Sequence, residues 1–140
     1  MNKHSHFGVY GVISSGTKML VIKKARGPYT GLYDLPGGSS EDGELLEQTV
    51  TREILEETGC TVEKLEQIKA VSALYPYQDG DASCELRHIG VLFQVEISGD
   101  PMTEGDGQDS NGCVWLNLSK LDENNATPFV LMAKTFHMSV

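Results

Sequence analysis

Short runs of β-branched and aromatic residues near the start of the chain predict two adjacent strands. They cover residues 7–14 (FGVYGVIS) and 18–23 (KMLVIK), with the turn sequence SGT between them. Residues 26–39 carry four glycines and two prolines with only brief apolar pieces. This composition predicts a long ordered loop in which residues 32–35 are briefly extended.

A helical period replaces the strand pattern in the next segment. Residues 44–58 contain no glycine or proline, and Leu46, Val50 and Ile54 recur every four residues, as they would on one face of an α-helix. Gly59 follows, and glycine at this place typically ends a helix. This segment gives the strongest helix prediction in the chain.

The second half of the chain predicts a long hairpin, a short strand and a C-terminal helix. Residues 62–77 and 85–97 are strand-like and are joined by the polar turn QDGD, and a further short strand covers residues 113–116. Thr127 before Pro128 is typical of a helix start, and this helix would run to about residue 137. We therefore expect one domain over residues 1–140, of the α/β (α+β) class, with a mixed β-sheet covered by helices.

Charge and composition narrow the function classes. The formal net charge of −9 disfavours a nucleic-acid partner, because such proteins need a basic face. The apolar stretches are too short to span a bilayer and no leader pattern is visible, so we expect a cytoplasmic protein without a membrane partner. The three cysteines are isolated and odd in number, which favours buried thiols over disulfides or a zinc site.

Acidic residues concentrate in residues 38–60, which hold seven of them and one basic residue, Arg52. On a helix, Glu53, Glu56 and Glu57 stand at i, i+3 and i+4 and share one face. Like charges at these spacings destabilise a helix by roughly 0.2–0.5 kcal/mol per pair, and a bound cation would relieve them. Carboxylate oxygens suit Mg2+ or Mn2+, and Mg2+ typically binds one or two carboxylates together with substrate phosphates.

Three glutamates at this spacing are most often only a solvated helix face. The complete pattern argues for a site instead. It reads Gly38, five residues, Glu44, seven residues, Arg52-Glu53-Ile54, one residue, Glu56-Glu57, one residue, Gly59.

This pattern closely resembles the signature of the Nudix (MutT-like) hydrolase family. The sequence GLYDLPG before it resembles the approach segment of that family, and the flanking strands suit its α/β/α sandwich. Cys60 is the one departure in the box, where an aliphatic residue is usual, and cysteine packs as a small hydrophobe. The resemblance thus covers most of the chain.

The resemblance implies a box at residues 38–60 that binds metal, Mg2+ or Mn2+, and the diphosphate of a substrate. The implied metal ligands are the carbonyl of Gly37 and the side chains of Glu53, Glu56 and Glu57. Gly38 and Gly59 would be structural, while Glu44 and Arg52 would form a supporting pair.

The general base stays open at this point. Many family members use an acidic residue on a later loop, for which Asp109 is our choice ahead of Glu104 and Asp106. Other members use a helix glutamate, so Glu53 and Glu56 remain rivals.

The resemblance implies hydrolysis of a diphosphate linkage in a nucleotide. The expected reaction cuts a nucleoside triphosphate to a monophosphate and pyrophosphate by attack of water on phosphorus. An ADP-ribose, nucleotide-sugar or dinucleotide pyrophosphatase is the alternative enzyme, and a nucleotide sensor without catalysis is the alternative class. Small members are often homodimers.

Residues that would contact the substrate are harder to choose. We expect Arg26 and Tyr33 to do so; Lys23 and Lys24 are more typical of surface charge, and Tyr75 or Tyr77 would stack on a base or serve only in packing. Asn124 or Asn125 before the last helix is a further suggestion. The sequence HSH at residues 4–6 is expected to be a loose terminus.

Overall fold

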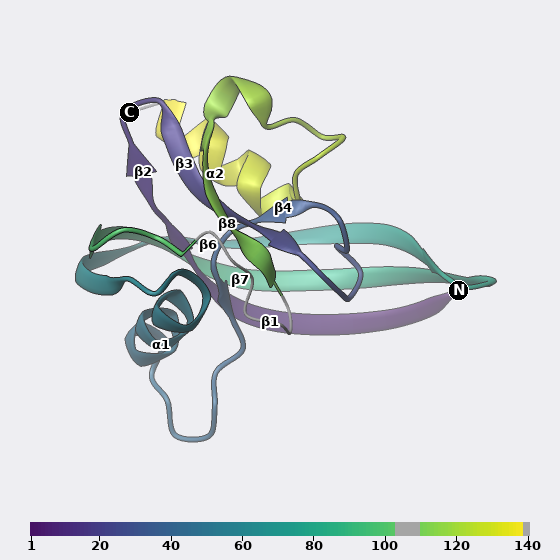
Figure 1. Ribbon diagram of the computed structural model, residues 1–140. Helices are drawn as coiled ribbons and strands as arrows, with labels where there is room; N and C mark the ends of the chain where they lie inside the picture. Colours follow the sequence, from purple (N-terminus) through teal and green to yellow (C-terminus); the bar gives the residue numbers. More distant parts are fainter. Residues whose placement is uncertain (103–109, 139–140) are drawn as a thin grey trace.

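The strands of the protein form two sheets in the computed structural model, which describes residues 1–102 and 110–138 (Figure 1). The first sheet has the order β5-β1-β7-β6, made of β5 (Gly37–Gly38), β1 (Asn2–Val12), β7 (Ala82–Ser98) and β6 (Thr61–Asp79). In the second sheet, β3 (Lys18–Lys24) pairs with β2 (Ser14–Ser15), β4 (Tyr33–Asp34) and β8 (Ser110–Asn117). β1 runs parallel to β7, and the other strand pairs are antiparallel, so the expected mixed pairing is confirmed.

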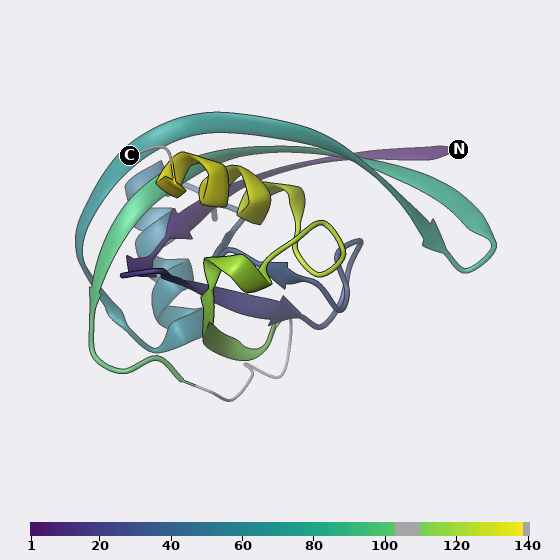
Figure 2. The ribbon, with the colours of Figure 1, turned by 90° about the horizontal axis from the view of Figure 1, so that it is seen from above.

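Two helices cover the strands from opposite sides, α1 (Leu46–Thr58) and α2 (Pro128–Met138), and a 3-10 turn, η1 (Leu118–Lys120), follows β8 (Figures 1 and 2). The alternation of side chains along β1 and the residue after it explains this arrangement. Val9 and Ile13 pack with Ile54 of α1, whereas Tyr10 and Val12 pack in a second core cluster with α2. Because the strands are buried on both faces, they need a helix on each face. The predicted α/β/α sandwich is confirmed.

β1 is longer than predicted. It begins at Asn2 instead of residue 7, because it pairs with β7 in an unbroken parallel register from Asn2 opposite Cys84 to Val12 opposite Gln94. The expectation that residues 4–6 form a loose terminus was therefore wrong, and His4 and His6 lie in the strand. Pairing with a distant strand, which no local pattern reveals, orders this segment.

The hairpin of β6 and β7 is also longer than predicted, because Asp79 pairs with Ala82 and leaves a turn of only two residues. Figure 2 shows this hairpin and the start of β1 projecting beyond the rest of the molecule.

The helix boundaries agree closely with those predicted from the sequence. α1 begins at Leu46, two residues later than predicted, because the backbone of Leu45 is extended at φ −79° and ψ 162°. Gly59 ends the helix as predicted, with φ 76° and its N–H donating to the carbonyl of Leu55. At α2, the hydroxyl of Thr127 accepts the N–H of Val130 at 3.4 Å, as expected of an N-cap.

Two further expectations concern chemistry outside the site. All three cysteines, Cys60, Cys84 and Cys113, are buried free thiols, as predicted. Within residues 1–102 and 110–138, no helix has the length and apolar character needed to cross a membrane.

Replacing Ile54 with alanine should destabilise the fold strongly, since its side chain is fully buried between α1 and the strands. We expect the free energy of unfolding to fall by about 2–5 kcal/mol, measured by denaturant unfolding. Leu55→Ala is the matched control on the same helix, because Leu55 is 53% exposed and should lose less than about 1 kcal/mol. Equal losses in the two variants would contradict this packing.

Candidate active site

A cleft of about 710 Å³ lies where α1, β5 and the loop after β3 meet β1 and β7. Glu53 and Glu57 reach it from α1, and Gly37 lines it from β5. Lys24 and Arg26 supply positive charge on its wall. The cleft therefore combines carboxylates, a glycine backbone and cations, which is a composition suited to a metal and a phosphorylated ligand.

Glu57 is the buried carboxylate of the site, with only 5% of its surface exposed. Its Oε1 accepts the backbone N–H of Gly37 at 2.7 Å. Burial raises the pKa of Glu57 well above its usual value, and the negative charges of Glu53 and Asp34 raise it further, while the N–H of Gly37 and the charge of Lys24 act against this shift. The ionised form of Glu57 is thus disfavoured until more positive charge arrives.

Arg52 holds the acidic residues around it in a fixed arrangement. Its Nε donates to Glu44 at 2.7 Å and its Nη2 donates to the same carboxylate at 3.0 Å. Nη1 donates to Glu53 at 2.9 Å and to Glu56 at 3.2 Å, and Nη2 also donates to the carbonyl of Ser39 at 3.0 Å. The hydrogen bonds from Arg52 lower the pKa of Glu44 to about 2. The predicted support of the box by Glu44 and Arg52 agrees with this geometry.

The two glycines of β5 let the backbone approach the site closely. Gly37 has φ 152°, and a side chain there would overlap the carbonyl oxygen of Val9 and the backbone of Tyr10. A Cβ on Gly38 would lie 2.9 Å from the carboxylate carbon of Glu53. Gly37 therefore requires glycine for space and for its backbone conformation, whereas a side chain on Gly38 would displace the carboxylate of Glu53.

The residues present fit a hard divalent cation. Glu53 and Glu57 line the same cleft, and the charge of Glu53 makes the ionised form of Glu57 less favourable, an effect that a cation between them would offset. In the part of the chain that the structure describes, no three His, Cys, Asp or Glu side chains converge as a ready-made cage. Mg2+ needs only one or two carboxylates when phosphates and water complete its shell, so this donor set suits it.

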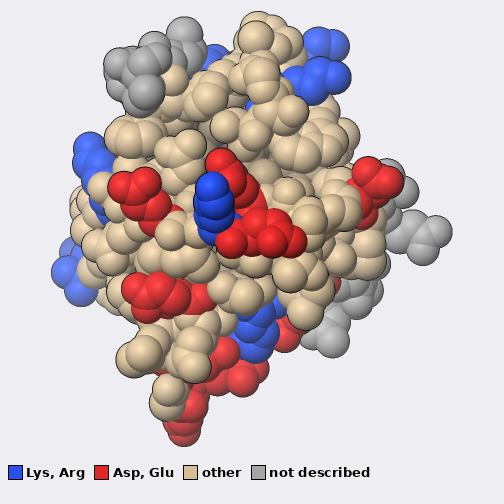
Figure 3. Space-filling view, turned by 90° about the vertical axis from the view of Figure 1, so that its left-hand side faces the viewer, with Lys and Arg blue, Asp and Glu red and all other residues tan. Residues whose placement is uncertain are grey.

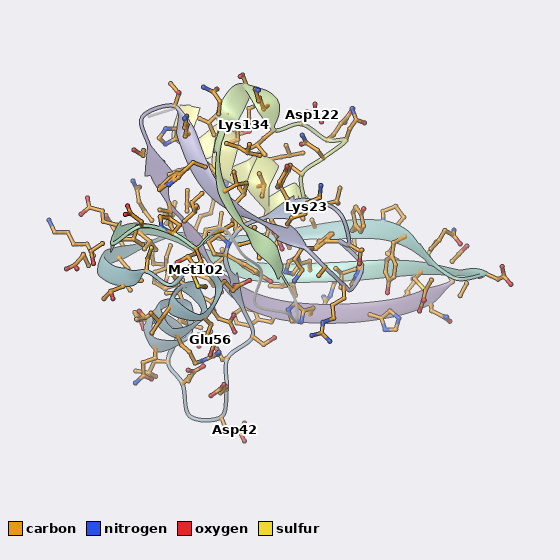
Figure 4. The ribbon with its side chains drawn as sticks, viewed as in Figure 1. Lys23, Asp42, Glu56, Met102, Asp122 and Lys134 are labelled. Carbon is orange, nitrogen blue, oxygen red and sulfur yellow. The ribbon has the colours of Figure 1, made fainter. Side chains whose placement is uncertain are left out.

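Five of the predicted site residues that the structure describes line the cleft, and five do not. Those that line it are Arg26, Gly37, Gly38, Glu53 and Glu57, and those that do not are Tyr33, Glu44, Arg52, Glu56 and Gly59. Glu56 has a side chain that is 54% exposed and lies beside Arg52; Figure 4 shows it on α1, away from α2. The ring of Tyr33 lies under Lys23, whose Nζ is 5.2 Å from the ring centroid. The backbone N–H of Tyr33 donates to the carbonyl of Asn125. Asp109, like Glu104 and Asp106, lies outside the described residues.

Asn124 and Asn125, suggested before the last helix, also lie away from the cleft. The side chain of Asn125 bonds within its own loop, to the N–H of Asp122 and the carbonyl of Lys120.

Several residues of the cleft wall did not emerge as site residues from the sequence, among them Tyr10, Tyr29, Asp34 and His88. His88 is 2% exposed and stacks on Phe129, with ring centroids 4.1 Å apart. Burial lowers the pKa of His88 to about 4, so its ring is neutral at pH 7. The alternation of side chains along β7 could have identified His88 as a buried residue, since it places His88 on the same face as the buried Leu86 and Leu92.

Acidic side chains gather on the face of the molecule drawn in Figure 3, with single basic side chains between them. The positive charge of Lys24 inside the cleft contrasts with this surface. It acts on both Glu57 and Asp34, whose pKa values it lowers against the effect of burial. The cleft therefore offers cationic side chains to a phosphorylated ligand in an otherwise acidic protein.

Comparison with known proteins agrees with this geometry. The family model of the NUDIX domain matches residues 2–135. The chain is 32% identical over 118 residues to the ADP-ribose pyrophosphatase of Methanocaldococcus jannaschii, covering 84% of this chain and 65% of that protein. It is 42% identical over 110 residues to the oxidized purine nucleoside triphosphate hydrolase of Danio rerio, covering 79% of this chain and 64% of that protein. The chain thus spans about two thirds of the length of each relative.

A solved structure supports the fold. The MutT NUDIX hydrolase from Burkholderia pseudomallei superimposes with a TM-score of 0.75 at 23% identity, covering 94% of this chain and 97% of that chain. With the family model matching nearly the whole chain, and with Gly38, Glu53 and Glu57 of the box lining one cleft, the chain belongs to the Nudix family.

Proposed function

We propose that this protein is a metal-dependent pyrophosphohydrolase that cuts a diphosphate linkage in a nucleotide. The observation that carries the proposal is the meeting of Glu53, Glu57 and Gly37 with Lys24 and Arg26 in one cleft. A metal-bound diphosphate requires carboxylates to hold the metal and cations to contact the phosphate oxygens. The preferred reaction cuts a nucleoside triphosphate to a monophosphate and pyrophosphate.

Glu53, Glu57 and the carbonyl of Gly37 would hold a divalent metal, Mg2+ or Mn2+, with Glu56 as a further ligand. Bound there, the metal would neutralise the charge of the diphosphate and polarise the attacking water. Because Glu56 is exposed and lies beside Arg52, it would join the metal only after a change of rotamer.

The remaining polar residues bind and orient the substrate. Lys24 and Arg26, which line the same cleft, would hold the phosphate oxygens, with Lys24 added to the residues expected from the sequence. Arg52 acts as a positioning residue, because its hydrogen bonds to Glu44 and Glu53 hold the carboxylates in place. A carboxylate would remove the proton from the attacking water, and Glu53, Glu56 and Asp109 remain the alternatives for that role.

The substrate remains a choice between two classes that the names of the relatives suggest. One relative is named for ADP-ribose and another for oxidized purine nucleoside triphosphates. Both substrates contain a diphosphate next to a nucleoside, so the same box serves either. The intact box favours an enzyme over a nucleotide sensor.

Product analysis by chromatography tests the reaction. We expect a Mg2+-dependent product from at least one member of a panel of nucleoside triphosphates, oxidised purine triphosphates, ADP-ribose, nucleotide sugars and dinucleotides. Glu57→Gln should lower kcat/KM by about a hundredfold or more, because it removes a charge from the metal site. Glu47→Gln makes the same chemical change on the exposed part of α1 and should retain full activity. A wild-type protein that binds one of these compounds but hydrolyses none would favour the sensor.

Metal binding can be tested without any substrate. Because burial disfavours the charge of Glu57, Glu57→Gln should leave the stability of the metal-free protein unchanged or higher; the amide oxygen can still accept the N–H of Gly37. Mg2+ should stabilise the wild type, by about 2.7 kcal/mol at a hundredfold excess over its Kd, and should not stabilise the variant. The measurement is thermal unfolding with and without Mg2+, with Glu47→Gln as control. An equal Mg2+ effect in Glu57→Gln would remove Glu57 from the metal site.

A further inference from the structure

We propose that the part of the cleft wall formed by Tyr10, Tyr29, Asp34 and His88 reads the nucleobase of the substrate through one accepted and one donated hydrogen bond. These residues line the same cleft as Glu53 and Glu57. The inference rests on the proposed function for the identity of the ligand as a nucleotide. It goes further by naming the residues that would select one nucleobase over another.

Asp34 supplies the acceptor. It is 3% exposed, and its Oδ1 accepts both the N–H of Leu35 at 2.8 Å and the hydroxyl of Thr127 at 2.8 Å. Its Oδ2 takes part in neither bond. Every fully buried side-chain polar atom in the described residues has a hydrogen-bond partner, so Oδ2 is not fully enclosed and faces the cleft that Asp34 lines. Burial raises the pKa of Asp34, and the hydroxyl of Thr127, the charge of Lys24 and the N–H of Leu35 act against this rise by favouring the carboxylate. In that form, Asp34 presents one acceptor oxygen to a ligand.

A chain of three rings supplies the donor. The hydroxyl of Tyr10 lies 2.7 Å from Nε2 of His88, and the hydroxyl of Tyr29 lies 3.0 Å from Nδ1. Burial raises the pKa of both tyrosines, so both hydroxyls keep their hydrogens, and the neutral imidazole carries one N–H. The two hydroxyls and the imidazole thus carry three hydrogens, but only two hydrogen bonds join the three rings. Whichever tautomer His88 adopts, one tyrosine accepts from the ring and has its own hydrogen left to donate elsewhere.

The free hydroxyl hydrogen and Oδ2 of Asp34 together suit a ligand with an acceptor and a donor. The ring edges of nucleobases carry both groups in one plane. The rings of His6 and Tyr77 also line the cleft, and aromatic walls favour a planar ring over a sugar. The sugar and phosphates would then extend toward Lys24 and the box. The chemistry of this wall therefore points to the base.

Asp34→Asn inverts the hydrogen bonding of this wall without changing its shape. The N–H of Leu35 and the hydroxyl of Thr127 both donate to Oδ1, so the amide oxygen must take that place. The amide NH2 then takes the position of Oδ2 and turns an acceptor into a donor. A site built to hydrogen-bond one group discriminates strongly against its opposite, so base preference should change.

The test measures binding of the four common nucleoside monophosphates by calorimetry without metal. We expect Asp34→Asn to change the ratio of Kd values between the best and the worst base by about tenfold or more. Asp122→Asn is the matched control, because Asp122 lies in the loop before α2 and does not line the cleft (Figure 4); its ratios should equal those of the wild type. Unchanged ratios in a folded Asp34→Asn protein would overturn the inference.

Tyr10→Phe and Tyr29→Phe provide a second test that does not depend on the folding of the Asp34 variant. At least one of them should weaken binding of the preferred base by about tenfold, because one hydroxyl donates to it. If both bind every base as the wild type does, the inference is wrong.

Failure of the hydrolase proposal would be seen separately. A protein that hydrolyses nothing but whose base preference shifts with Asp34→Asn would keep the base-reading wall and lose only the catalytic role. Hydrolysis with equal kcat/KM for all bases in the wild type would overturn the base-reading wall and leave the hydrolase proposal intact.

Discussion

The hydrogen bond from the N–H of Gly37 to Oε1 of Glu57 joins the helix that carries the box to the sheet that supports it. Gly37 pairs with Tyr10 of β1, so the same residue links α1 to the strand at the centre of the molecule. One N–H offsets only part of the cost of burying a carboxylate, and the charges of Glu53 and Asp34 add to that cost. The fold thus holds Glu57 in a place where its charge is stable only with a cation nearby. Mg2+ or Mn2+ would be that cation in the proposed enzyme.

Arg52 offsets the repulsion between the other carboxylates of the box. Its planar guanidinium donates to Glu44, Glu53 and Glu56, so three carboxylates share one fixed cation. Glu57 points the other way, into the cleft, where Lys24 is the cation whose charge favours its ionised form. Glu44 and Glu56 therefore share Arg52 away from the cleft, whereas Glu57 lines the cleft. Glu53 belongs to both sets, because it accepts from Arg52 and also lines the cleft.

Local patterns predicted most of the fold and the box. The period of four in residues 44–58 and the glycine after it gave α1, and alternation gave the hairpin, because both signals depend on neighbours within a few residues. The parallel pairing of β1 with β7 could not be predicted, since it joins segments about eighty residues apart. The same limit explains why His88 and Asp34 emerged only from the structure: Tyr29 and Thr127 reach them from distant parts of the chain. By contrast, the box lies within one continuous segment, so its pattern could be recognised from the sequence alone.

The electrostatic asymmetry of the cleft would determine how a nucleotide enters it. Glu53 and Glu57 with a metal, and Lys24 beside them, form a charged end that attracts phosphates. Tyr10, Tyr29 and His88 form an uncharged part of the wall, because burial holds both tyrosines protonated and His88 neutral. A phosphate placed against that wall would face the carboxylate of Asp34, whereas a base placed at the charged end would leave the metal charge uncompensated. In the proposed enzyme, the two ends would therefore favour a nucleotide bound with its diphosphate at the box.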